Sequence, residues 1–140
     1  MSTNSRIGMV QKDGTVKSVY CHWDGYPSNN GAILLKHYTD PEKVKKLIEL
    51  GDLSYIGKEV EPAEGQKHDF GNPAMDVTVA YHRDRGKDLN IRVNHNQDDY
   101  FNSDISSYGY LLTLDNVWLY SAKRGATPRI LTKEICNIKD

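Results

Sequence analysis

The stretch that decides the fold is RIGMVQKDGTVKSVYCHW, residues 6–23. Residues 6–10 and residues 16–23 are two segments with the pattern of extended strands. Asp13-Gly14 between them predicts a turn, because glycine tolerates a positive φ and aspartate hydrogen-bonds the nearby backbone. We therefore predict a β-hairpin, in which side chains alternate between two faces. The core face is expected to hold Val19, Cys21 and Trp23, and the opposite face Ser18, Tyr20 and His22.

Two short helices are expected directly after this hairpin, within about residues 31–50. Residues 24–31 combine Gly, Pro and Asn, so this segment is predicted to leave the sheet as a loop. Residues 32–38 then form the first helix, and Asn29 or Asn30 is available to cap its unpaired N–H groups.

The second helix is predicted to begin at Thr39-Asp40-Pro41-Glu42, with the Thr39 hydroxyl as its cap and proline in the first turn. Apolar residues at positions i, i+3 and i+4 give it one apolar stripe, formed by Val44, Leu47 and Ile48. Gly51 is the expected end of this helix.

The second half of the chain reads as a long loop followed by two hairpins. Residues 57–72 are polar and interrupted by Gly and Pro, which predicts a surface loop, with a short helical turn near residues 53–56. Residues 77–82 and 91–94 are predicted strands around a charged turn at 83–88.

A further hairpin is predicted from residues 108–114 and 117–122, joined at Asp115-Asn116. Residues 130–138 fit either a strand or a short helix. The pattern as a whole predicts one α+β domain over residues 1–140, a mainly antiparallel sheet of hairpins with the two helices packed on one face.

Charge and composition exclude several classes of function. Eighteen Lys and Arg stand against 19 Asp and Glu, so the net charge of −1 argues against general nucleic-acid binding and against an anionic membrane surface. No apolar run approaches the roughly 20 residues that cross a bilayer, and the first six residues lack the apolar stretch of a signal peptide. We therefore expect a cytoplasmic protein.

The two cysteines, Cys21 and Cys136, show no zinc-binding spacing and are expected to be reduced thiols. Cys21 precedes His22, but neighbouring residues of a strand point to opposite faces, so His22 is badly placed to activate the thiol. A pair between Cys21 and a distant His82 or His68 stays open as the alternative. We expect no catalytic residues and no cofactor.

His82-Arg83-Asp84 matches a tripeptide of protein kinases, but the other kinase motifs are missing from the sequence. Arg83 and Arg85 have planar forks that suit phosphate or carboxylate. In the structural alternative, which we favour, Asp84 pairs with one of the two arginines.

The segment 95–104 is acidic, with Asp98, Asp99 and Asp104 as candidate oxygen ligands for a cation. Its spacing does not match a calcium-binding EF-hand loop. We favour a solvated acidic loop over a metal site. The nine tyrosines suit binding interfaces, because tyrosine buries much area at little entropic cost, although tyrosine is also common in strands.

The block Tyr20-Cys21-His22-Trp23-Asp24-Gly25-Tyr26-Pro27 resembles a family of small accessory proteins encoded by bacteriophages and prophages. Segments that look like the same family are residues 47–54, 78–86, 108–111 and 117–120. The resemblance implies a phage gene acting in a bacterial cytoplasm, and it brings no catalytic residue set with it.

In that context we expect a protein that binds and inhibits a host bacterial protein, such as a nuclease or CRISPR effector, for host takeover or counter-defence. Two alternatives are a sponge that sequesters a signalling nucleotide, using arginines as phosphate clamps and Tyr20 and Tyr26 as stacking platforms, and a small Cys/His-dependent hydrolase. The sequence leaves the oligomeric state open. The candidate binding residues are Tyr20, His22, Trp23, Asp24, Tyr26, Arg83, Asp84 and Arg85.

Overall fold

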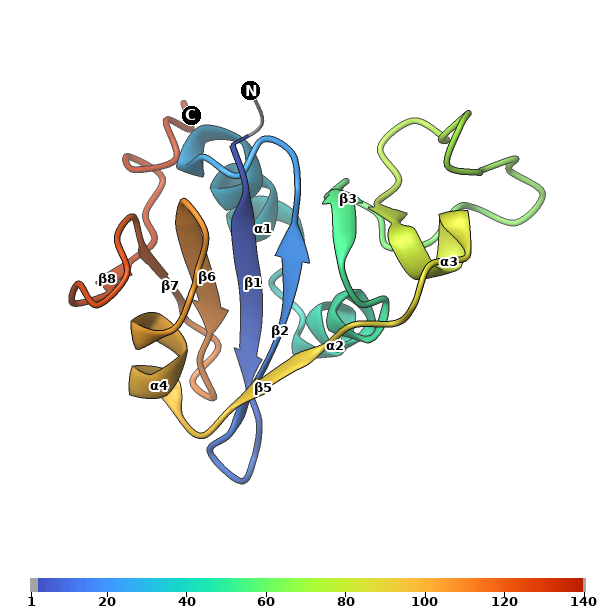
Figure 1. Ribbon diagram of the computed structural model, residues 1–140. Helices are drawn as coiled ribbons and strands as arrows, with labels where there is room; N and C mark the ends of the chain where they lie inside the picture. The colour runs from blue at the N-terminus through green and yellow to red at the C-terminus, as the bar shows by residue number, and fades with distance from the viewer. Residues whose placement is uncertain (1–2, 140) are drawn as a thin grey trace.

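The computed structural model describes residues 3–139, and it places helices on both faces of one sheet (Figure 1). The strands are β1 (Ser5–Val10), β2 (Val16–Cys21), β3 (Leu53–Tyr55), β4 (Val79–Ala80), β5 (Arg92–Asn94), β6 (Tyr108–Leu112), β7 (Trp118–Ser121) and β8 (Arg129–Ile130). The helices are a single π-helical turn η1 (Pro27–Gly31), α1 (Ala32–His37), α2 (Pro41–Glu49), α3 (Tyr81–Arg85) and α4 (Gln97–Asn102). Within the described residues, no helix has the length and apolar character needed to cross a membrane.

The sheet is mixed: most of its strand pairs are antiparallel, as expected, but it is not built of hairpins alone. Its strand order is β4-β3-β2-β1-β6-β7-β8, with β5 also paired to β2. The pairs β1–β6 and β2–β3 are parallel, and the other pairs are antiparallel. Parallel strands need a long crossover rather than a hairpin. For β2–β3 that crossover contains η1, α1 and α2.

The two hairpins with the clearest turn residues are confirmed. β1 and β2 pair with Ile7 opposite Val19, and Gly14 in their turn has a φ of 90°. β6 and β7 pair with Tyr110 opposite Tyr120, and Asn116 in their turn has a φ of 63°. Both turns contain a residue type that tolerates a positive φ.

The predicted hairpin around residues 83–88 is wrong. β4 is only two residues long and pairs with β3, after which the chain forms α3. The Asp84 carboxylate accepts a hydrogen bond from the N–H of Ala80 at 2.8 Å and so stabilises the first turn of this helix. Gly86, expected near a hairpin tip, instead ends α3 with a φ of 71°. β5 pairs with β2 rather than with β4.

Two smaller expectations also change. Residues 53–55 form β3 beside the end of β2, with Leu53 opposite Cys21, rather than a helical turn. The end of the chain, left open between strand and helix, is the short β8 followed by a turn over residues 133–137. The long loop expected over residues 57–72 is confirmed, and Figure 1 shows it extending beside α3.

The helix caps differ from those predicted. Asp40, and not Thr39, caps α2, because its side chain accepts from the N–H of Glu42 at 3.0 Å. Neither Asn29 nor Asn30 caps α1, which continues directly from η1. The end of α2 before Gly51, which has a φ of 77°, is as predicted.

The two faces of the sheet carry separate apolar clusters. On one face, the predicted stripe of α2 is buried with α1 against residues such as Ile7 and Val19. On the other face, Tyr100 and Phe101 of α4 pack with Val16 and Leu111. The two predicted helices therefore share a face as expected, but the segment expected to be a solvated acidic loop contains α4, which covers the opposite face.

Candidate functional site

The aromatic block begins where β2 ends, and its backbone stays attached to β3. The N–H of His22 donates to the carbonyl oxygen of Leu53 at 3.0 Å, and that of Trp23 donates to Ser54 at 2.9 Å. Asp24 then turns the chain with a φ of 56°. Because the backbone up to this turn is hydrogen-bonded to the sheet, the points from which these side chains leave the backbone are fixed.

Trp23 lies on the surface, which corrects its predicted place in the core. Its side chain is 43% exposed, whereas Val19 and Cys21 are buried as predicted. The ring of Trp23 meets the His22 ring edge-on, with 4.7 Å between ring centroids. Nδ1 of His22 is in turn 2.8 Å from the Tyr20 hydroxyl. Tyr20, His22 and Trp23 thus form one connected row.

Tyr26 is the other exposed aromatic residue of the block, at 39%. The neighbouring Gly25 is buried, and its N–H donates to Thr3 while its carbonyl oxygen accepts from the Tyr110 hydroxyl at 2.7 Å. A Cβ at Gly25 would lie 2.6 Å from backbone atoms of Asn4, so only glycine fits this position. We call the side chains of Tyr20, His22, Trp23 and Tyr26 the aromatic surface; Trp23 and Tyr26 are exposed, and the other two are half-buried.

Cys21 points away from the aromatic surface into the core. Its thiol donates weakly to the carbonyl oxygen of Trp23 and accepts from the side chain of Asn30. Burial raises the pKa of this thiol to about 12. A thiol in this state is a poor nucleophile, because the reactive form is the thiolate. His68 and His82, the histidines considered as its bases, are bonded to Ala74 and Lys87 instead.

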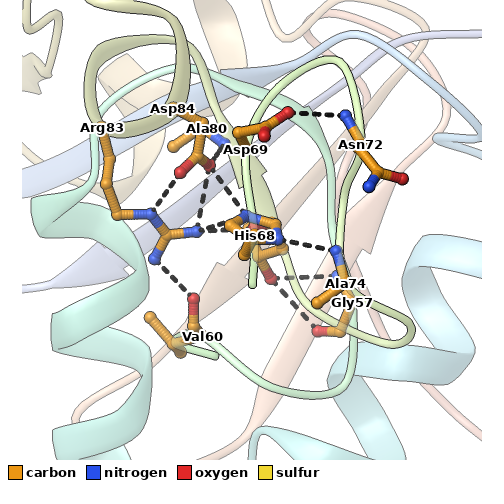
Figure 2. A network of polar contacts seen from close by, with 10 residues as sticks. Gly57, Val60, His68, Asp69, Asn72, Ala74, Ala80, Arg83 and Asp84 are labelled. Atoms are coloured by element: carbon orange, nitrogen blue, oxygen red, sulfur yellow. Dashed lines mark hydrogen bonds and ion pairs between the residues drawn. The ribbon is translucent and has the colours of Figure 1, made fainter. Parts of the chain in front are cut away.

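The second group of candidate residues belongs to α3, and Asp84 is its centre (Figure 2). The Asp84 side chain is 5% exposed and accepts from Arg83 Nε at 2.9 Å. His68 Nε2 lies 3.3 Å from Asp84 Oδ2. Burial alone would raise the pKa of Asp84, but the hydrogen bonds from Arg83 and the Ala80 N–H outweigh it and lower this pKa.

Arg83 is directed into the protein, as the structural alternative predicts. Besides its bonds to Asp84, Nη1 donates to the carbonyl oxygen of Val60 at 2.7 Å and Nη2 to that of Thr78 at 2.6 Å. His68 accepts from the N–H of Ala74 through Nδ1, so in its neutral form the proton is on Nε2, facing Asp84. Figure 2 shows this network fastening the loop to α3.

The two groups of predicted residues are linked through Asp52, which the sequence did not single out. Its side chain accepts from the N–H of Tyr20 at 2.9 Å, and its carbonyl oxygen accepts from the N–H of Tyr81 at 3.2 Å. Phe70 stacks at a tilt on Tyr81, with 5.7 Å between centroids, and Arg85 lies over the Phe70 ring. Phe70 lies in the long loop, and Asp52 lies directly before β3. Sequence periodicity predicts helices and strands only, so it did not indicate either residue.

Neither a metal cluster nor a known relative helps to identify the site. Within residues 3–139, no three His, Cys, Asp or Glu side chains are placed to hold a metal ion together. Comparison with protein-family models, with curated proteins and with solved structures finds no match.

Proposed function

We propose that this chain is a bacteriophage-encoded accessory protein that binds a host bacterial protein in the cytoplasm and inhibits it without catalysis. The role would be host takeover or counter-defence, for example against a CRISPR or other nuclease effector. The observation that carries the proposal is the pair of exposed aromatic side chains, Trp23 and Tyr26, on a backbone that hydrogen bonds hold in place.

Such side chains are the usual anchors of protein interfaces. Tryptophan and tyrosine are enriched among the few residues that carry most of the binding energy, each contributing about 2 kcal/mol or more when truncated to alanine. An anchor held before binding loses less conformational freedom when the partner arrives. The contact of Trp23 with His22 and the buried Gly25 provide such pre-ordering here.

The two alternatives find less support in the geometry. A hydrolase based on Cys21 would need an accessible thiol with a base beside it, whereas this thiol is buried and bonded to Asn30. A nucleotide sponge clamped by Arg83 would need a free guanidinium fork, whereas this fork donates to Asp84, Val60 and Thr78. Binding through a surface needs neither.

The test combines capture with inhibition. Tagged chain is used to capture proteins from bacterial lysate, and native mass spectrometry determines their stoichiometry. We expect a stoichiometric partner that is lost with Trp23→Ala/Tyr26→Ala and kept with Met75→Ala, a control at a side chain that is 83% exposed. The captured partner should also lose its own activity when equimolar wild-type chain is added. Equal capture by both variants, or a partner whose activity is unchanged, would refute the proposal.

A further inference from the structure

Two arginines flank β2 on the face of the sheet that carries Tyr20. Arg6 on β1 pairs with Tyr20, and Arg92 on β5 pairs with Ser18. Directly paired residues of antiparallel strands share a face, and residues two apart on one strand do as well. Arg6 and Arg92 therefore approach the same place above Ser18 from either side of β2.

Neutral acceptors hold both guanidinium groups. Arg6 Nη1 donates to the Ser18 hydroxyl at 3.1 Å. Arg92 donates through Nη1 to the carbonyl oxygen of Asp104 at 2.9 Å and through Nη2 to the Ser103 hydroxyl at 2.8 Å. These contacts fix the direction of the forks, but none of them brings a carboxylate into direct contact with the two positive charges.

No carboxylate within residues 3–139 forms an ion pair with either arginine, since the ion pairs there join Lys58 to Asp76 and Asp84 to its two partners. The nearby acids are engaged elsewhere. One Asp99 oxygen accepts from the N–H of His95 and the side chain of Asn94, and Asp104 accepts from the N–H of Ser106. Asp99 and Asp104 therefore act on Arg92 only from a distance, and neither guanidinium group is paired with a carboxylate.

Both groups also have unmet bonding capacity. The Nε atoms of Arg6 and Arg92 are buried without an acceptor. A buried unsatisfied donor is uncommon and often marks the place of a water or an ion. Burial lowers the pKa of Arg92 and the charge of Arg6 lowers it further, and the more distant Asp104 and Asp99 do not fully offset these two effects. An anion between the two arginines would offset the repulsion between their like charges.

We propose that Arg6 and Arg92 together bind the phosphate group of a small phosphorylated ligand above Ser18. Guanidinium forks match the oxygens of a phosphate, and two forks balance the two charges of a phosphate monoester. The site lies away from Arg83, whose charge is already balanced by Asp84, and the inference does not depend on the proposed protein partner. Tyr20, opposite Arg6 on the same face, borders it.

Inorganic phosphate is the probe for the first experiment, a series of thermal unfolding curves. For the wild-type protein we expect the Tm to rise by about 4 °C for each tenfold increase in phosphate above its Kd, beyond what chloride of equal ionic strength does. Phosphate also stabilises proteins in general by exclusion from their surface. Arg6→Gln and Arg92→Gln should keep only that general effect, while Arg129→Gln, an exposed arginine on β8, should behave like the wild type.

A second measurement keeps the proposal falsifiable if either variant fails to fold. In ¹H–¹⁵N spectra of the wild-type protein, the side-chain Nε–H signals of Arg6 and Arg92 should shift with phosphate and reach saturation, while that of Arg129 should not. An equal phosphate response of wild type and Arg6→Gln, or arginine signals that do not move, would overturn the proposal.

Discussion

At the scale of single residues, Cys21 and His22 show how one strand separates two kinds of side chain. They are neighbours in sequence, yet the thiol lies in the core and the imidazole contacts Tyr20 and Trp23 on the surface. The alternation of a strand is sufficient to predict that they do not act together. The exposure of Trp23 was not predictable from that alternation, because β2 ends before it.

Both cysteine thiols should be unreactive in the folded protein. Burial raises the pKa of Cys21 to about 12 and that of Cys136 to about 11, so neither forms appreciable thiolate near pH 8. We expect almost no reaction with a disulfide reagent under native conditions, and reaction of both thiols after denaturation. Rapid reaction of one native thiol would reveal an accessible nucleophile and would restore the hydrolase alternative.

Asp84 should contribute stability that depends on pH. Its pKa is lowered in the folded state, so the contribution is complete above the ordinary aspartate value of 3.8 and is lost as the pH falls through the folded value. At pH 7, Asp84→Asn should lower the free energy of unfolding by about 3 kcal/mol, because it leaves Arg83 without its counter-charge.

Urea unfolding at several pH values measures this effect. The difference between wild type and Asp84→Asn should shrink as the pH falls below 4, because the Asp84 carboxylate then becomes protonated in the folded protein. Asp115→Asn, at an exposed turn, is the control and should change little at any pH. A difference that grows as the pH falls below 4 would contradict the assigned role of the carboxylate.

At the scale of elements, the sequence predicts what local patterns encode. The Asp-Gly turn, the apolar stripe of α2 and the polar turn at Asn116 are local signals, and the elements around them are confirmed. The hairpin predicted around residues 83–88 failed because Gly86 suits a helix end as well as a turn tip. The deciding contact, from Asp84 back to the N–H of Ala80, belongs to a network with His68 that pattern analysis does not show.

Arg83 should hold the long loop against α3, and we call this role the clasp. Its fork donates to the carbonyl oxygens of Val60, near the start of the loop, and of Thr78, directly before β4. Arg83→Met keeps the aliphatic stem but loses these bonds. We expect a lysine-specific protease to cleave after Lys67 at least about tenfold faster than in the wild type, since 1.4 kcal/mol of local stability is a factor of ten in the open population.

The matched control for the clasp is Arg85→Met. Arg85 lies over Phe70 but makes no bond to Val60 or Thr78, so its variant should be cleaved at nearly the wild-type rate. If both variants were cleaved at the same increased rate, the stacking of Arg85 on Phe70 would matter as much as the hydrogen bonds of Arg83. The role of the clasp would then not belong to Arg83.

At the scale of the whole molecule, the parallel pairing of β1 with β6 joins distant parts of the chain. No local pattern predicts it, because a pairing across about a hundred residues depends on which strand edges remain available after the hairpins form. The same limit explains why α4 was missed as a cover of the second face. Its tyrosine, Tyr100, donates to the carbonyl oxygens of Arg6 and Tyr110 and so joins α4 to both strands.

Because both apolar clusters pack on the same strands, the molecule should unfold as one unit. Leu111→Ala removes a buried side chain from the α4 side and should lower the free energy of unfolding by about 3 kcal/mol. The buried Trp118 reports on the opposite side, where its ring N–H donates to Tyr38. A Trp23→Phe background leaves Trp118 as the one tryptophan of the sequence. In one cooperative unit, Trp118 fluorescence and far-ultraviolet circular dichroism then give the same denaturation midpoint, and Leu111→Ala lowers both equally. A midpoint for Trp118 that stays at the wild-type value while the dichroism midpoint falls would mean that the two faces unfold separately. In that case the face with Arg6, Tyr20 and Arg92 could open without disturbing the core on the α2 side of the sheet.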